Sequence, residues 1–325
     1  MADAADEGDA VPVDGVAVTA IGVAVIRARE DARADRLYTD PLALAFVDAA
    51  RAGFPRERWD RLEALAGRFY EGRTVGVRLV DDTVRDALEH GIRQFVLLGA
   101  GLDTRAFRMG LPPDSVVFEL DLPETFAFKE PVLERAGAVP ACTRHVVPAD
   151  LRSGWRSALL ESGFRPELAT QWIEEGTLGN PTEDWKRRLV EDLTAMSAAG
   201  SRFGVGRFAV DAESPQYREY RDLVGGEEGA GEKAAGEKAA GEERAGAERA
   251  GGEWAGGEAA AERASTPGPW GGPDAAGRAE DGVERWLQDI GWDTVFRSWN
   301  AMTAGLGRDV AQDDPGVGTI SATRR

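Results

Sequence analysis

The feature that most constrains the fold is a continuous apolar run that ends in glycines. Residues 94–98 read QFVLL, in which the four residues after Gln94 are apolar, and Gly99-Ala100-Gly101 follows at once. A strand with consecutive apolar residues is typical of a parallel sheet covered by helices on both faces. Glycines at its carboxyl end are typical of the turn from strand to helix in such sheets. The run therefore predicts a parallel α/β sheet.

The segments around this run repeat the same alternation. Further strands are expected over 115–120, 144–147, 171–173 and 202–210, with helices over 122–136, 155–162 and 182–197. Repeated β-α units predict a doubly wound, Rossmann-like α/β fold. Before the first strand, apolar residues recur at helical spacing over 15–30 and over 59–90, and Asp40-Pro41 begins another helical stretch between them. We therefore expect a helical N-terminal part.

Composition divides the chain into one domain with an insertion and two loose ends. Residues 225–281 form a degenerate Ala/Gly/Glu/Lys repeat with almost nothing to bury, which predicts a low-complexity insertion. The domain is expected to comprise 15–224 and, because apolar patterning returns, also 282–308. A disordered leader over 1–14 and a loose tail over 309–325 are expected at the ends.

Charge and residue usage exclude several classes of partner. The chain has 39 basic and 57 acidic residues, a net charge of −18, which disfavours nucleic acid and anionic membranes. One cysteine, Cys142, and two histidines, His90 and His145, cannot form a thiolate zinc cluster or a three-histidine site, so no metal is expected. Because no signal peptide or long apolar stretch is present, we expect a cytoplasmic protein.

The glycine turn and the next strand suggest a nucleoside site. Gly99 allows a tight turn, and Gly101 lets a ligand approach the backbone at the carboxyl end of the sheet. Asp121 ends the next strand about 20 residues later, the distance at which an acidic side chain meets ribose hydroxyls. Thr104 stands where the third glycine of a dinucleotide fingerprint would be, so S-adenosylmethionine fits better than NAD.

A longer block is far more specific than the turn alone. The stretch RQFVLLGAGLDTRAFRM, with GVAVTAIGVAVIRARE, RLYTDPLALAFV, VFELDLPETFAFK, PADLRSGW, WIEEG, ERWLQDIGW and GLGR, resembles the leucine carboxyl methyltransferase superfamily. Within it, the chain is similar to a bacterial branch linked to small-molecule or polyketide O-methylation. The resemblance covers most of 15–224 and 283–308 and implies a class I S-adenosylmethionine-dependent methyltransferase with C-terminal lid elements.

The resemblance also implies roles for individual residues. Gly99, with Ala100 and Gly101, would contact the cofactor by backbone, and Asp121 would bind its ribose. Asp150-Leu151 would frame the adenine edge, and Glu175 would lie beside the cofactor near the reaction centre.

The methionyl carboxylate would be bound by an arginine, which can pair with it bidentately. Arg73 fits the spacing of the eukaryotic members, whereas Arg78 fits the bacterial pattern better, so the choice stays open. No catalytic residue follows from the resemblance.

The reaction expected is O-methylation of a small-molecule carboxylate or hydroxyl. A carboxylate acceptor is already ionised at neutral pH, whereas a hydroxyl needs a general base. Two alternatives are methylation of a protein C-terminal carboxylate and a cofactor-binding protein without catalysis. One segment departs from the family: after WIEEG the chain reads Thr177 to Pro181, where members continue with an apolar run ending in Tyr-Leu. That segment borders the acceptor pocket, so the identity of the acceptor is left open.

Overall fold

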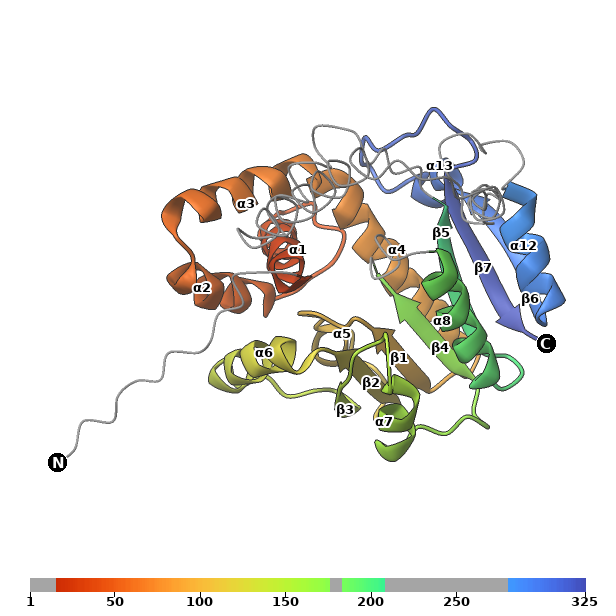
Figure 1. Cartoon of the computed structure of the whole chain (residues 1–325). Helices are drawn as coiled ribbons and strands as arrows, with labels where there is room; N and C mark the ends of the chain where they lie inside the picture. Colours follow the sequence, from red (N-terminus) through yellow and green to blue (C-terminus); the bar gives the residue numbers. More distant parts are fainter. Residues whose placement is uncertain (1–15, 176–182, 208–279) are drawn as a thin grey trace, which may run out of the picture.

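The computed structural model describes residues 16–175, 183–207 and 280–325, which form a single sheet with helices on both faces (Figure 1). The sheet has seven strands in the order β3-β2-β1-β4-β5-β7-β6. Their bounds are β1 Gln94–Leu98, β2 Val116–Asp121, β3 Thr143–Pro148, β4 Thr170–Glu174, β5 Arg202–Arg207, β6 Trp292–Ser298 and β7 Gly318–Arg324. Strands β1 to β5 are parallel, and β7 pairs antiparallel with both β5 and β6.

The central strand is buried as its sequence predicts. All five residues of β1 are buried, with Phe95 and Leu97 in one core cluster and Val96 and Leu98 in another. The first cluster includes residues of α4 (Tyr70–Glu89) and α5 (Arg105–Arg108). The second includes residues of α7 (Trp155–Glu161), α8 (Glu183–Ala195) and α12 (Glu280–Asp289). The prediction of a doubly wound α/β fold is therefore confirmed.

The N-terminal helices form a cap with a core of its own. Helices α1 (Val16–Asp31), α2 (Ala43–Gly53) and α3 (Arg56–Arg68) pack together and against α6 (Pro123–Arg135), which follows β2 (Figure 1). The helix expected over 59–90 is two helices, because the backbone of Phe69, at φ −93° and ψ 3°, separates α3 from α4.

The prediction of a loose tail over 309–325 is wrong. Strand β7 fills the space between β5 and β6, and its Ile320 and Ala322 are almost fully buried. The strand reads GTISATR, so its two buried apolar residues lie among small polar ones, and the alternation is too weak to stand out in the sequence.

The C-terminal part also begins slightly earlier than predicted. Helix α12 begins at Glu280, two residues before the expected boundary at 282. After β6, the short helix α13 (Trp299–Thr303) places Trp299 in a small buried cluster that also includes Val75 of α4. The predicted leader, and the predicted insertion up to residue 279, lie outside the described residues.

Candidate functional site

Three neighbouring strands bring three predicted site residues to one edge of the sheet. In the register of the sheet, Leu98 of β1 lies beside Leu120 of β2 and Glu174 of β4. Gly99, Asp121 and Glu175 follow these residues directly. The strand order reverses between β1 and β4, which is where open α/β sheets bind ligands outside the carboxyl ends of their strands.

The glycine turn has the conformation that its sequence predicts. Gly99 and Gly101 have φ values of 66° and 48°, in the left-handed region that favours glycine. The Ala100 amide donates to the Leu120 carbonyl at 2.8 Å, which fixes the turn against β2. A Cβ on Gly101 would lie 3.2 Å from the Cβ of Ala20, so helix α1 passes close over the turn.

Asp121 joins the turn to the start of α6. Its Oδ2 accepts the Gly101 amide at 2.6 Å, and its Oδ1 accepts the Leu122 amide at 2.7 Å and the Thr125 hydroxyl at 2.9 Å. A carboxylate has about four acceptor positions. Three are used here, so Asp121 holds the turn in place and retains one position for a ligand hydroxyl.

Asp150 and Leu151 lie in the turn after β3. The Asp150 carboxylate accepts the Arg152 amide at 2.8 Å and the Arg152 guanidinium at 2.6 Å. Hydrogen bonding to Arg152 lowers the pKa of Asp150. Leu151 packs its side chain against the main core.

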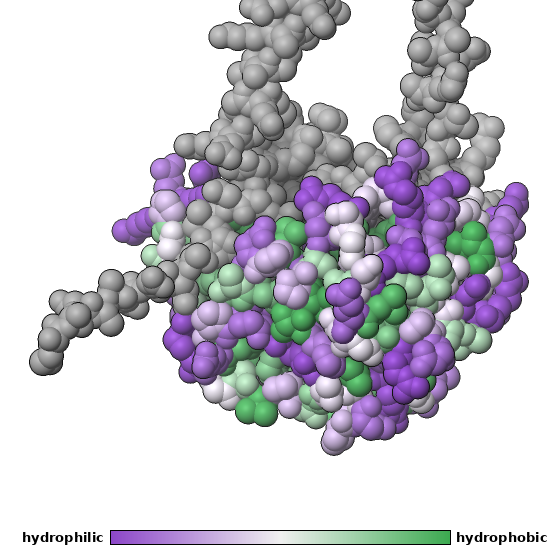
Figure 2. Space-filling model, turned by 60° about the horizontal axis from the view of Figure 1, so that its bottom comes forward, coloured by the Kyte–Doolittle hydropathy of each residue, from purple (hydrophilic) through white to green (hydrophobic). Residues whose placement is uncertain are grey.

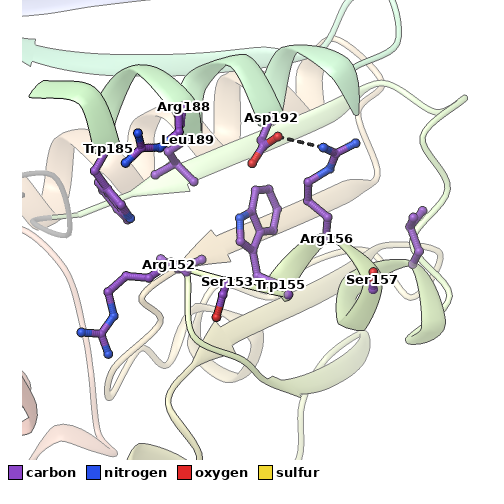
Figure 3. Close-up of a pocket in the computed structure, with 12 residues that line it drawn as sticks. Arg152, Ser153, Trp155, Arg156, Ser157, Trp185, Arg188, Leu189 and Asp192 are labelled. Atoms are coloured by element: carbon purple, nitrogen blue, oxygen red, sulfur yellow. Dashed lines mark hydrogen bonds and ion pairs between the residues drawn. The ribbon is translucent and has the colours of Figure 1, made fainter.

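A pocket of about 370 Å³ lies between α7 and α8, with Leu151 at its edge. Figure 3 shows Trp155 and Trp185 facing this hollow, and Arg156 of α7 bound to Asp192 of α8 at 2.8 Å. Its lining includes neither the glycine turn nor Asp121 nor Glu175. The pocket therefore adjoins the predicted adenine edge and is separate from the strand-end residues.

Glu175 is ion-paired and partly unsatisfied. One of its oxygens lies 2.9 Å from Nη1 of Arg105, and the other is buried with no hydrogen-bond partner among residues 16–175, 183–207 and 280–325. It is thus a fixed carboxylate at the end of β4 rather than a mobile surface group.

The two candidate arginines of α4 have different surroundings. Arg78 is engaged, since Nε binds Asp82 at 2.9 Å and Nη1 donates to the Leu37 carbonyl at 3.0 Å. Arg73, in the first turn of the helix, is half-buried, and its guanidinium has no hydrogen bond or ion pair within the described part of the chain. The structure leaves Arg73 the more available cation.

Sequence reasoning missed a buried charge network beneath the site. Asp81 of α4 accepts Arg105 Nε at 2.8 Å and the two terminal nitrogens of Arg108 at 2.6 and 2.7 Å. Arg105 also binds Asp103. Burial opposes ionisation of both aspartates, but the arginines outweigh it and lower the pKa of Asp81 and of Asp103. The sequence signal for this network is that charged residues alternate with apolar ones in the segment LDTRAFRM.

The network extends to the N-terminal cap. Arg27 of α1 donates to Asp40 at 2.9 Å and to the Leu102 carbonyl at 2.6 Å. The hydroxyl of Thr104 donates to the same carboxylate at 2.8 Å. Thr104 thus fixes the cap onto the segment that follows the glycine turn.

Comparison with known proteins decides the family. The sequence model described as leucine carboxyl methyltransferase matches residues 20–194, more than half of the chain. The chain belongs to the leucine carboxyl methyltransferase family. The fold is accordingly that of a class I methyltransferase, and the predictions of the family and of a methyltransferase are confirmed.

Two similar family members come from actinobacteria. A protein of Parafrankia, provisionally named an S-adenosyl-L-methionine-dependent methyltransferase, is 42% identical over 228 residues, which are 66% of this chain and 74% of that protein. A Frankia alni protein with the same provisional name is 43% identical over 211 residues, 63% of this chain and 72% of the relative. A solved structure of a provisionally named methyltransferase from Thermobifida fusca has a TM-score of 0.49 and 16% identity, covering 100% of this chain and 99% of that one.

The described residues contain neither a membrane-spanning helix nor a metal-binding cluster. No helix in these ranges combines the length and the apolar character needed to cross a membrane. No group of three or more His, Cys, Asp or Glu side chains in them is arranged to hold a metal ion.

Proposed function

We propose that this family member transfers the methyl group of S-adenosylmethionine to an oxygen of a small molecule, with a carboxylate favoured over a hydroxyl. Methyltransferase activity and dependence on S-adenosylmethionine follow from the family and from the names of the relatives. The class of acceptor is the part that we propose. The observation that carries it is that Asp81 and Asp103, the two aspartates of the charge network, are held ionised by Arg105 and Arg108.

The residues at this edge suit an adenosyl amino acid. Asp121 keeps one acceptor position for a ribose hydroxyl, and the Gly99-Ala100-Gly101 turn offers backbone without crowding side chains. Asp150 and Leu151 would border the adenine. The buried unpaired oxygen of Glu175 and the available guanidinium of Arg73 provide opposite charges for an amino acid group. These residues are our proposed cofactor site.

The cofactor supplies a methyl group that its sulfonium already activates. The task left to the protein is to hold an acceptor oxygen in line with that methyl group and to keep water out. The network of Arg105, Asp81 and Glu175 contributes by fixing the end of β4 beside the glycine turn.

The acid-base chemistry of the site favours an acceptor that arrives ionised. A hydroxyl acceptor needs a general base with a pKa near the working pH. Asp81 and Asp103 have lowered pKa values because Arg105 and Arg108 stabilise their ionised forms, so both are weak bases. A small-molecule carboxylate needs no such base, and this supports carboxyl methylation.

The surface does not favour a nucleic acid or an anionic membrane as the partner. On the face in Figure 2, apolar residues are scattered among hydrophilic ones. The net charge of −18 disfavours association with nucleic acid or an anionic membrane.

The test is transfer of an isotope-labelled methyl group from S-adenosylmethionine. The purified protein is incubated with small-molecule fractions and, separately, with protein fractions of a bacterial extract, with Asp121→Ala as the matched control. We expect label in the small-molecule fraction that is released as methanol by mild base, as a methyl ester requires. Label only in the protein fraction, or only in base-stable products, would contradict the proposed acceptor.

A further inference from the structure

Two hydroxyl groups near the site are buried, and neither makes a hydrogen bond of normal geometry within the described residues. Tyr38 is 5% exposed and Thr74 is fully buried, and their two hydroxyls lie close enough to interact weakly with each other. The second oxygen of Glu175 also has no hydrogen-bond partner among the described residues. Buried polar groups are nearly always hydrogen-bonded, because an unmet donor or acceptor is costly. Such groups gathered in one place suggest a ligand that would satisfy them.

The contacts of Tyr38 place it against the same face of α4 as Thr74. The carbonyl of the preceding residue, Leu37, accepts a hydrogen bond from Arg78 at 3.0 Å. Thr74 lies four residues before Arg78, and residues at this spacing share a helix face.

The same contacts connect Tyr38 to the end of β4. The guanidinium of Arg108 lies over the Tyr38 ring, 5.4 Å from its centroid. Arg108 and Arg105 bind one carboxylate, that of Asp81, and Arg105 in turn binds Glu175. Tyr38 and Thr74 therefore lie on the side of the site where the cap, α4 and Glu175 meet.

The surroundings keep the Tyr38 hydroxyl protonated. Burial raises the pKa of Tyr38, and Glu30 and Glu175 raise it further, against the opposing effects of Arg27 and of the weak interaction with the neighbouring Thr74 hydroxyl. At neutral pH the phenol is thus a hydrogen-bond donor, as is the Thr74 hydroxyl. Two donors beside several arginines are suited to an anionic oxygen.

We propose that Tyr38 and Thr74 donate hydrogen bonds to the α-carboxylate of the methionyl part of the cofactor. The inference rests on the proposed use of S-adenosylmethionine at this edge of the sheet. The two hydroxyls would orient the amino acid part of the cofactor, and Glu175 would accept a hydrogen bond from its α-ammonium group. Tyr38 and Thr74 are binding residues that take no part in the transfer of the methyl group.

The test compares two ligands that differ in the amino acid part. S-adenosylhomocysteine carries the α-carboxylate, whereas 5′-methylthioadenosine lacks it. Both are titrated by calorimetry into the full-length protein and into Tyr38→Phe and Thr74→Val. We expect each variant to bind S-adenosylhomocysteine at least about tenfold more weakly, roughly 1.4 kcal/mol. The affinity for 5′-methylthioadenosine should change less than about twofold, since that ligand has no carboxylate to lose.

Two controls separate this effect from a change of fold. Thr83→Val removes a hydroxyl from the same helix, where it donates to the Leu79 carbonyl at an exposed position, and should change neither affinity. Tyr38→Phe keeps the ring under Arg108 and deletes an unpaired group, so the unliganded protein should melt no lower than wild type.

The remaining outcomes overturn the inference in distinguishable ways. If wild type binds S-adenosylhomocysteine and both variants keep its affinity within twofold, the hydroxyls do not bind the carboxylate. Equal losses for both ligands would mean that they shape the whole pocket instead. Wild type that binds neither ligand would refute the proposed function as well.

Discussion

Replacing Asp81 by asparagine should destabilise the protein far more than replacing its neighbour Asp82. Asp81 is fully buried and accepts three charge-assisted hydrogen bonds from Arg105 and Arg108, at 2.6 to 2.8 Å. Asp82 has 41% of its side chain exposed and pairs with the surface arginines Arg78 and Arg85. The two residues thus form a matched pair that differs in burial.

The expected magnitudes follow from that difference. Breaking a buried ion pair by removing one partner costs about 3–5 kcal/mol, because the other charge stays buried. Arg105 keeps Asp103 and Glu175, so we expect a cost for Asp81→Asn near the lower end of this range. Exposed pairs contribute about 0–1 kcal/mol, which is the expectation for Asp82→Asn.

The assay is urea unfolding followed by circular dichroism at pH 7. Asp81→Asn should lower the midpoint with an unchanged slope and differ from Asp82→Asn by at least about 2 kcal/mol. Equal stabilities of the two variants would refute the expectation that the buried pairing of Asp81 with Arg105 and Arg108 stabilises the fold.

The same pair of variants has a defined pH dependence. The pKa of Asp81 is lower in the folded protein than in the unfolded chain, where it is about 3.9. Its stabilising contribution is therefore complete above about pH 4 and is lost as the pH falls through the folded value. The gap between wild type and Asp81→Asn should narrow below about pH 4, and a gap independent of pH would contradict this reasoning.

Three more predictions concern the candidate arginines, the low-complexity segment and strand β7. Arg73→Ala should weaken binding of S-adenosylhomocysteine in calorimetry at least about tenfold with little change in melting temperature, whereas Arg78→Ala should lower the melting temperature because it removes the bond to the Leu37 carbonyl. Replacing residues 227–279 by a short flexible linker should change the affinity for S-adenosylhomocysteine less than about twofold, because loop-closure entropy varies only logarithmically with length. Removing 318–325 should prevent cooperative thermal unfolding, since it exposes the edges of β5 and β6.

The sequence predicted the parts of the fold that depend on local pattern. The apolar run at Gln94–Leu98 and the turn after it identified the central strand, and the strand pattern put Gly99 and Asp121 at strand ends. Glu175 was expected near the cofactor from the resemblance to the family, and it follows β4 directly. Which arginine binds the methionyl group was not decided by spacing, because it depends on what each guanidinium contacts in three dimensions.

The elements that were missed depend on distant neighbours. Strand β7 pairs with β5, which lies more than 100 residues earlier in the chain. Its apolar residues alternate with small polar ones too weakly to predict a buried strand. The buried network joins Asp81 to Arg105, 24 residues away, and charged residues in a sequence are usually read as exposed. Nothing in the local sequence marks Tyr38 and Thr74, because their burial without a hydrogen bond of normal geometry in the described residues depends on how the cap packs against α4.

We infer that the edge formed by Gly99, Asp121 and Glu175 binds S-adenosylmethionine. The test is calorimetric titration of wild type with S-adenosylhomocysteine and with NAD, repeated on Asp121→Asn. We expect one molecule of S-adenosylhomocysteine per chain, no heat from NAD, and at least about a tenfold loss of affinity in the variant, since a hydrogen bond to a charged group contributes about 1.5–3 kcal/mol. Binding of NAD in place of S-adenosylhomocysteine, or unchanged affinity in Asp121→Asn, would contradict it.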